Sequence, residues 1–417
     1  MKKTMLAAGL LCGVFMTANN AFAWDYAWPF TSTSRSLAVS HVSVDAYLPW
    51  NSGGSAKAMG MGGAFTAVAD DLGGAVEYNP AGLSYLEHVN VGALAIANRA
   101  TSLSATGAKT SKWTFTPTYA GGALKIGPLA VAVSRKQPQE NPGAYLKLSR
   151  AGWWGIVAPD GFPMNYDTVS DKMDTSGLKT YVLTAAIKLG RLSLGANYNS
   201  IKGDITRVQS GGISAQQATW YTTGQSNRFY TSEKVQFNGY TMDAGALLDM
   251  GILRLGASAK NFKGSVDVTR NSYWSDNFVW GSGSGPQNNW TWTSPTTKEN
   301  MTEFAPTYSA GAALLLGKLV TVDMDYVTAT LQDSTKAMGR LGAQVAVIPG
   351  FLFARGGVKS DFKNLVQGQN NKTNEYFLGA GLKLAVLTVD ASASLVQAKA
   401  GNAGGDMTGS VSAMLKF

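Results

Sequence analysis

Along most of the chain, apolar residues alternate with small or polar residues in segments of roughly ten residues separated by turns. One clear segment has apolar residues at Leu253, Leu255, Ala257 and Ala259, with Arg254, Gly256, Ser258 and Lys260 between them. Successive side chains of a β-strand point to opposite faces, and a tilted strand needs about 9–11 residues to cross a bilayer. Strands of soluble proteins are usually about 5–6 residues long. The pattern therefore predicts an all-β transmembrane barrel.

We expect about 14 antiparallel strands, near residues 88–98, 112–124, 128–136, 178–189, 191–204, 235–250, 252–264, 305–316, 318–330, 337–348, 351–359, 374–384, 386–397 and 407–417. Their connections alternate between tight turns and longer loops, of which 137–177, 205–234 and 265–304 are the longest. Short turns are typical of the periplasmic end of a barrel and long loops of the outside. The last strand ends at Phe417, a terminal aromatic that resembles the signal read by the barrel assembly machinery.

The N-terminus has the pattern of a secretory signal peptide. Two lysines precede an apolar run from Met5 to Met16, and the segment closes on Ala21-Phe22-Ala23, an A-x-A cleavage site. We therefore expect export to a bacterial outer membrane. The expected organisation is a signal peptide at 1–23, an N-terminal extension with a hatch (plug) at 24–86, and the barrel at 87–417.

Composition narrows the function classes. The 417 residues are 45% hydrophobic but only 15% charged, against about 25% charged in ordinary soluble proteins. The single cysteine, Cys12, lies in the expected signal peptide, so thiolate metal sites and disulfides are not expected. Only His41 and His88 could serve a Ser-His-Asp hydrolase or a histidine zinc site. The net charge of +9 has no basic block. We expect no enzyme activity, cofactor, metal or nucleic-acid partner.

The segment from Ser55 to Leu86 differs from the strands. Its apolar part, Ala56 to Ala69, is too short and too interrupted by glycine to span a bilayer. Asp70-Asp71 and Asn79-Pro80-Ala81 are turn signals. Irregular backbone at membrane depth persists only where protein or water satisfies it, so this segment is expected to be a plug inside the lumen. We expect its glycines to pack against the barrel wall and its aspartates to form turns or caps.

This segment resembles the N-terminal hatch of the FadL/TodX outer-membrane transporters of hydrophobic compounds. The residues that carry the resemblance are Gly60, Gly62, Gly63, Ala64, Phe65, Ala67, Ala69, Asp70, Asp71, Asn79, Pro80, Ala81, Gly82 and Leu83. The resemblance implies passive uptake of long-chain fatty acids or aromatic hydrocarbons, gated by a small rearrangement of the hatch. The gate residues that it implies are Gly60, Gly62, Gly63, Phe65, Asp70, Asp71, Asn79, Pro80 and Ala81.

Two observations keep other functions open. About thirty residues, Trp24 to Gly54, precede the hatch, whereas the hatches of that family begin close to the mature N-terminus. The sequence AMGMGGAFTAVADD is also similar to the corresponding segment of PorV-like barrels, which serve protein secretion or surface attachment. An open porin has no plug, and an outer-membrane hydrolase requires a histidine placed for catalysis.

A channel for fatty acids needs an apolar landing site and a cation for the carboxylate. Closely spaced apolar residues on an extracellular loop mark a binding patch, and the candidates are Trp153, Trp154, Ile156 and Phe162. A second aromatic cluster lies at 265–304, where an aromatic girdle or loop packing is the alternative. Inward-facing cation candidates are Lys260, Arg340 and Arg355. The expected partners are a hydrophobic small molecule, outer-membrane lipid and the assembly machinery, with the chain acting as a monomer.

Overall fold

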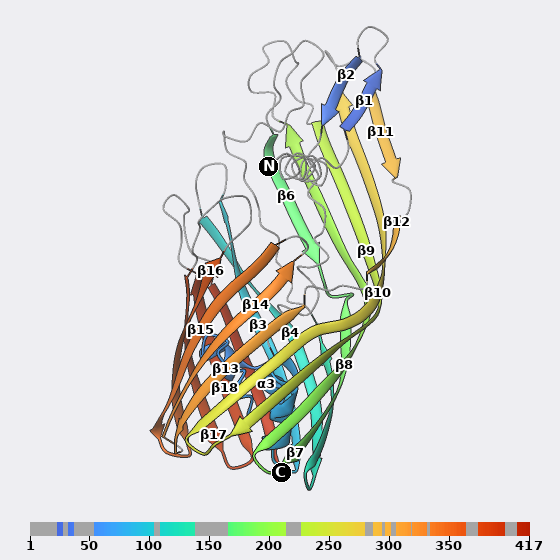
Figure 1. Cartoon of the computed structure of the whole chain (residues 1–417). Coiled ribbons are helices and arrows are strands. Elements are labelled where there is room, and N and C mark those ends of the chain that lie inside the picture. Colours follow the sequence, from blue (N-terminus) through green and yellow to red (C-terminus); the bar gives the residue numbers. More distant parts are fainter. Residues whose placement is uncertain are drawn as a thin grey trace, which may run out of the picture.

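A closed antiparallel β-barrel forms the body of the protein (Figure 1). The computed structural model describes residues 23–27, 32–36, 54–103, 109–137, 166–213, 227–279, 287–293, 297–301, 306–317, 319–331, 334–363, 374–396 and 407–417. Within these ranges fourteen strands pair side by side until the last meets the first. The fold class and the strand number predicted from the alternation are therefore confirmed.

The strands of the barrel follow one another in chain order. They are β3 (Val89–Leu103), β4 (Lys109–Ile126), β5 (Leu129–Lys136), β7 (Lys179–Leu189), β8 (Leu192–Ile213), β9 (Asn227–Asp249), β10 (Leu253–Val279), β13 (Thr307–Leu316), β14 (Val320–Leu331), β15 (Ser334–Ile348), β16 (Leu352–Lys363), β17 (Asn374–Leu384), β18 (Leu387–Val396) and β19 (Met407–Lys416). Closure gives every strand of the barrel a neighbour on both sides, as a sheet in hydrocarbon requires.

The outer surface of the barrel is apolar. Along β5, Leu129, Val131 and Val133 are exposed while the alternate residues Ala130 and Ala132 are buried. Large apolar side chains are exposed on the other strands as well, and exposed tyrosines stand near the strand ends remote from the short turns, at Tyr181, Tyr308 and Tyr376. An apolar band with aromatic residues at its border is the surface that a transmembrane barrel presents to lipid.

Short turns close one end of the barrel. Each of six described turns contains one residue with positive φ, at Gly127, Gly190, Gly251, Gly317, Gly350 and Ala385. Five of the six are glycine, the residue that adopts this conformation without steric cost. At the same end, the backbone of Phe417 exchanges two hydrogen bonds with Val89, which seals the last strand against the first. Figure 1 shows the C-terminus at this end of the barrel.

Three neighbouring strands continue far beyond the barrel. β8, β9 and β10 are 22, 23 and 27 residues long and rise past the other strands on one side (Figure 1). β6 (Tyr166–Asp174) pairs with β8, while β11 (Gln287–Thr293) and β12 (Thr297–Met301) pair with β10. One face of this extension buries Leu178, Ile201, Ile205, Val235, Phe237, Val266 and Val268.

The extension corrects the sequence expectation. Residues 205–234 and 265–304 were expected to be loops, yet 205–213, 227–234 and 265–279 continue their strands. Residues 166–174 of the expected loop at 137–177 also form a strand. Bilayer thickness sets the minimum length of a spanning strand but does not end it, because pairing with neighbours continues to satisfy the backbone outside the membrane.

The hatch, which we define as residues 54–86, lies inside the barrel, and Figure 1 shows α3 within the lower part of the lumen. It contains two short helices, α2 (Ala56–Gly60) and α3 (Leu72–Glu77), and the 3₁₀ helix η2 (Pro80–Tyr85). A polar side chain caps each of them: Ser55, Asp71 and Asn79 accept from Ala58, Gly74 and Ala81 N–H groups. These caps satisfy N–H groups that such short helices otherwise leave unpaired.

Two short strands lie in the chain ahead of the hatch. β1 (Ala23–Ala27) and β2 (Ser32–Ser36) form a separate two-stranded antiparallel sheet. The remainder of the expected N-terminal extension lies outside the described residues.

No helix among the described residues is long and apolar enough to cross a membrane.

The turn residues provide a test of backbone strain. A Cβ at Gly127 would meet nothing within 4 Å, so Gly127→Ala places alanine in the left-handed region and changes little else. We expect this variant to lose about 1 kcal/mol of unfolding free energy, measured by urea titration in lipid vesicles. Ala385→Gly should change the free energy in the opposite direction. Equal signs for the two variants would contradict this account.

Candidate functional site

At several places the hatch approaches glycines of the barrel wall closely. Three pairs of glycines face each other across neighbouring strands: Gly195 with Gly245, Gly256 with Gly311, and Gly342 with Gly357. A Cβ on any of the six would collide with the hatch or with a side chain that binds it. The contacts run along the hatch, from Pro80 at Gly195 to Met61 and Gly62 at Gly342 and Gly357.

The hatch glycines complete these contacts. A Cβ on Gly60 would lie 3.1 Å from the Cα of Gly379, and one on Gly62 would lie 2.9 Å from the backbone nitrogen of Val358. Gly62 and Gly63 also have positive φ, of 68° and 73°. The expectation that the MGMGG run packs tightly against the wall is confirmed.

Asn79 is the central polar anchor of the hatch. It is fully buried, and its side-chain nitrogen donates to the carbonyl oxygens of Thr66 (2.8 Å), Ala246 (3.0 Å) and Ala257 (3.3 Å). Its side-chain oxygen accepts from the Ala81 N–H at 3.2 Å. Ala246 lies in β9 and Ala257 in β10. The turn at Asn79 leads through η2 into β3, yet the side chain of Asn79 bonds to β9 and β10.

A second anchor joins the hatch to β14. One carboxylate oxygen of Asp325 accepts hydrogen bonds from the N–H groups of Phe65 (2.8 Å) and Thr66 (3.0 Å) and from the Thr66 hydroxyl (2.8 Å). Next to it, the Arg340 guanidinium donates to the Gly63 carbonyl at 3.1 Å. The ring of Phe65 is fully buried and packs edge-on against Tyr78 with centroids 5.8 Å apart. Phe65 is thus held by both its backbone and its ring.

Both aspartates of the hatch act within it. Asp70 forms an ion pair with Lys57 at 2.6 Å, and Asp71 accepts from the Ser55 hydroxyl at 2.5 Å, which links the caps of α2 and α3. Burial raises the pKa of the Asp71 carboxyl, and Lys57 and the Ser55 hydroxyl oppose that rise. The prediction of a capping role is confirmed for Asp71, whereas Asp70 forms an ion pair with Lys57.

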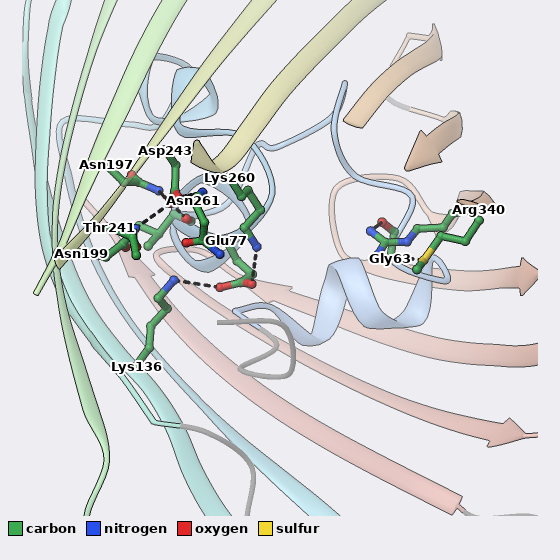
Figure 2. Close-up of polar contacts among 12 residues, drawn as sticks. Gly63, Glu77, Lys136, Asn197, Asn199, Thr241, Asp243, Lys260, Asn261 and Arg340 are labelled. Atoms are coloured by element: carbon green, nitrogen blue, oxygen red, sulfur yellow. Dashed lines mark hydrogen bonds and ion pairs between the residues drawn. The ribbon is translucent and has the colours of Figure 1, made fainter. Parts of the chain in front are cut away.

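Glu77, the last residue of α3, connects two walls of the barrel (Figure 2). Its carboxylate lies 3.1 Å from the Lys136 nitrogen of β5 and 2.6 Å from the Lys260 nitrogen of β10. Burial alone would raise the pKa of Glu77, but the two ammonium groups together outweigh it and hold the pKa below its ordinary value. Glu77 is therefore a carboxylate at neutral pH.

A polar cluster on the wall adjoins this ion pair (Figure 2). Asp243 of β9 accepts from the side-chain nitrogens of Asn197 and Asn199, each at 2.9 Å, and from the Asn261 N–H at 2.8 Å. Asn261 has a φ of 52° and lies in a register shift of β10 between Ala259 and Lys263. Such a bulge re-aims the side chains beside it, here Lys260.

The two sides of the hatch have different surroundings. Towards β3, β4, β5 and β7, α3 and η2 pack in an apolar cluster that includes Leu72, Val76, Leu83, Leu94, Ile96, Tyr119 and Val182. The wall on this side also buries polar residues, among them Thr116, Ser134 and Lys136. Towards β8 to β18 the buried wall residues are mostly polar or charged, among them Asn197, Asn199, Asp243, Arg254, Asp323, Asp325, Arg355 and Asp390. Polar bonds can be exchanged for bonds to water, whereas apolar contacts cannot.

The structure brings all nine predicted gate residues, Gly60 to Ala81, into the lumen, but it does not test their role. The cation candidates face the lumen, and each has an intramolecular partner: Lys260 has Glu77, Arg340 has Gly63, and Arg355 has Asp390 at 2.7 Å and Gln344. Trp153, Trp154, Ile156 and Phe162 lie outside the described residues. They stay predictions.

Three features of the site were not predicted. Lys136 continues the inward set Ala130, Ala132 and Ser134, so the alternation along β5 could have indicated it. Glu77 lies in the short helix α3, and no sequence pattern around it indicates a partner on the wall. The facing glycine pairs depend on register between strands far apart in sequence, and no local signal reveals that.

Among the described residues, no group of three or more His, Cys, Asp or Glu side chains could hold a metal ion.

Solved structures share this fold. No protein-family model matches the sequence, and no curated protein matches it. The Ralstonia pickettii toluene transporter TbuX is 14% identical over 87% of this chain and 98% of its own, with a TM-score of 0.59. The P. putida toluene transporter TodX (12%; 82% and 94%; 0.56) and a Pseudomonas aeruginosa FadL homologue (13%; 88% and 98%; 0.54) are also similar. The resemblance to FadL/TodX-type transporters is confirmed at the level of the fold.

The glycine contacts can be tested with neighbouring residues of one strand. In Gly357→Ala the new Cβ collides with the backbone of Met61 and Gly62, whereas in Gly356→Ala its nearest neighbour is 3.9 Å away. We expect Gly357→Ala to destabilise the seated hatch by about 1–3 kcal/mol, as overpacking does, and to raise proteolysis of the hatch. Gly356→Ala should behave as the unmutated protein. Both barrels should remain heat-modifiable on a gel, and equal proteolysis of the two variants would contradict this account.

Proposed function

We propose that this protein is a passive channel for hydrophobic solutes, such as long-chain fatty acids or aromatic hydrocarbons, in a bacterial outer membrane. The observation that carries the proposal is a seated hatch inside a closed barrel, held by capped short helices, bare glycine contacts and exchangeable polar bonds. The likeness of the fold to toluene transporters and to a FadL homologue supports it.

In this proposal the hatch is the gate. Its C-terminal part is attached through η2 to β3 and packs in the apolar cluster, so the hatch stays tethered to the barrel when it moves. Its N-terminal part, residues 54–70, touches the wall through glycines and polar bonds, and this part moves to let a solute pass. The movement exchanges the polar bonds of this part with bonds to water.

Capture is assigned to the extracellular loops. Trp153, Trp154, Ile156 and Phe162 are proposed to form the apolar landing site, because closely spaced exposed apolar residues bind apolar ligands. Export by a signal peptide, insertion by the assembly machinery and action as a monomer are parts of the same proposal. A PorV-like role in protein secretion or surface attachment is the alternative.

Replacing Asn79 tests the gate. Asn79→Leu leaves the carbonyls of Thr66, Ala246 and Ala257 without this donor, at a cost of about 1–3 kcal/mol per unsatisfied buried group. The equilibrium between seated and displaced hatch should shift by about tenfold or more. We expect altered uptake of labelled oleate and of toluene by cells that produce the variant, with the barrel still heat-modifiable. Pro80→Gly should act in the same direction.

A wall asparagine provides the matched control. Asn374 bonds to Ser360 on the neighbouring strand at 2.8 Å, so Asn374→Leu removes a wall contact and leaves the hatch bonds intact. Its uptake should equal that of the unmutated protein. Unchanged uptake with both Asn79→Leu and Pro80→Gly would remove the gating role. Absence of uptake of either solute by the unmutated protein would favour the secretion-type barrel.

A further inference from the structure

Three buried charges meet where the hatch crosses between opposite walls. The side chains of Lys136, Glu77 and Lys260 are only 2%, 5% and 16% exposed. Taking charges out of water costs several kcal/mol per ion unless they are closely paired, and here both ammonium groups lie within 3.1 Å of the same carboxylate. The lysines come from β5 and β10, so neither is a neighbour of the other in the sheet.

The charges of this site balance when Asp243 is included. Asp243 accepts from the neutral amides of Asn197 and Asn199 and from the N–H of Asn261, the residue that follows Lys260 (Figure 2). Counted by formal charge, Lys136 and Lys260 contribute two positive charges, and Glu77 and Asp243 contribute two negative charges. Withdrawing Glu77 would leave one uncompensated positive charge. A carboxylate of another molecule can restore the balance, whereas an uncharged solute cannot.

Glu77 is connected to the central anchor of the hatch. Asn79, which bonds to β9 and β10, follows it by two residues, and Tyr78 between them packs against Phe65. Val76, the preceding residue, accepts from the Asn197 amide at 2.9 Å. Moving the Glu77 carboxylate away from the lysines therefore pulls on contacts that seat the hatch against three strands.

We propose that Glu77 holds, in the seated hatch, the place that the carboxylate of the transported solute takes during passage. This inference rests on the proposed function and names the solute class as hydrophobic molecules with one carboxylate. The incoming carboxylate meets Lys260 first, because that side chain is the more exposed of the two lysines. It then replaces Glu77 on both ammonium groups, and the released Glu77 loosens the hatch. No covalent bond changes.

A matched ligand pair tests the head group. We would measure binding of a fluorescent polyene fatty acid and of its methyl ester to the purified full-length protein in neutral detergent. The unmutated protein should bind the acid about tenfold more tightly or better, since hydrogen bonds to charged groups are the stronger ones. In Lys136→Met/Lys260→Met this preference should disappear, with ester binding unchanged.

The Glu77→Gln variant tests the exchange itself. It removes the competing carboxylate and leaves both lysines, so acid binding should tighten by about tenfold while ester binding stays the same. The matched control is Glu375→Gln, because Glu375 pairs with Lys359 at 3.0 Å on the wall and not on the hatch. That control should leave both affinities unchanged. The triple change to glutamine of Glu77, Lys136 and Lys260 removes all three charges together and should abolish the preference without leaving a buried charge unpaired.

The outcomes separate this inference from the proposed function. If the unmutated protein binds acid and ester equally, or if the triple variant keeps the preference in a heat-modifiable barrel, the exchange is wrong while hydrophobic uptake stands. If Glu77→Gln fails to tighten acid binding, Glu77 does not compete with the solute. If the unmutated protein binds neither acid, ester nor toluene, the proposed function fails and this inference fails with it.

Discussion

The structure depends on one constraint: inside hydrocarbon, every backbone N–H and C=O group must find a partner within the protein. The strands meet it by closing into a ring, with Phe417 bonded to Val89 at the seam. A ring of fourteen strands encloses a lumen wider than its own inward side chains fill. The hatch occupies that space, and its irregular backbone must then be satisfied as well. Caps such as Asp71 and Asn79 and wall acceptors such as Asp325 do this.

Glycines on the wall determine how closely the hatch can approach it. Where Gly342 and Gly357 face each other, the backbone of Met61 and Gly62 fills the space that two Cβ atoms would take. Close seating excludes water from the polar bonds around it and strengthens them. The same contacts contain no interdigitated side chains, so separating the surfaces does not require rotamers to rearrange. Glycine contacts of this kind let the hatch close the lumen at rest and still separate from the wall.

Local patterns predict much of this molecule, and non-local register accounts for the rest. Two-residue alternation placed Lys260, Arg340 and Arg355 on the inside correctly, because the period of a strand is a property of the strand alone. Asp71 as a cap followed from its neighbours in sequence. By contrast, the opposition of Gly195 to Gly245 depends on pairing between distant segments. The continuation of β8, β9 and β10 beyond the barrel was not predicted, because membrane thickness limits only the minimum length of a strand.

The charges of the lumen constrain how any solute can be recognised there. Lys260, Arg340 and Arg355 are each engaged by a partner inside the protein in the seated state. An unpaired buried cation would destabilise the barrel, so holding one in reserve for a ligand has a large cost. Recognition of a negative group by these residues must therefore proceed by exchange with an internal acceptor. Two of these three partners lie in the hatch: Glu77 offers a carboxylate, and Gly63 offers a neutral backbone carbonyl. The third partner, Asp390, lies in the wall. Only the first exchanges one carboxylate for another and moves the hatch by doing so.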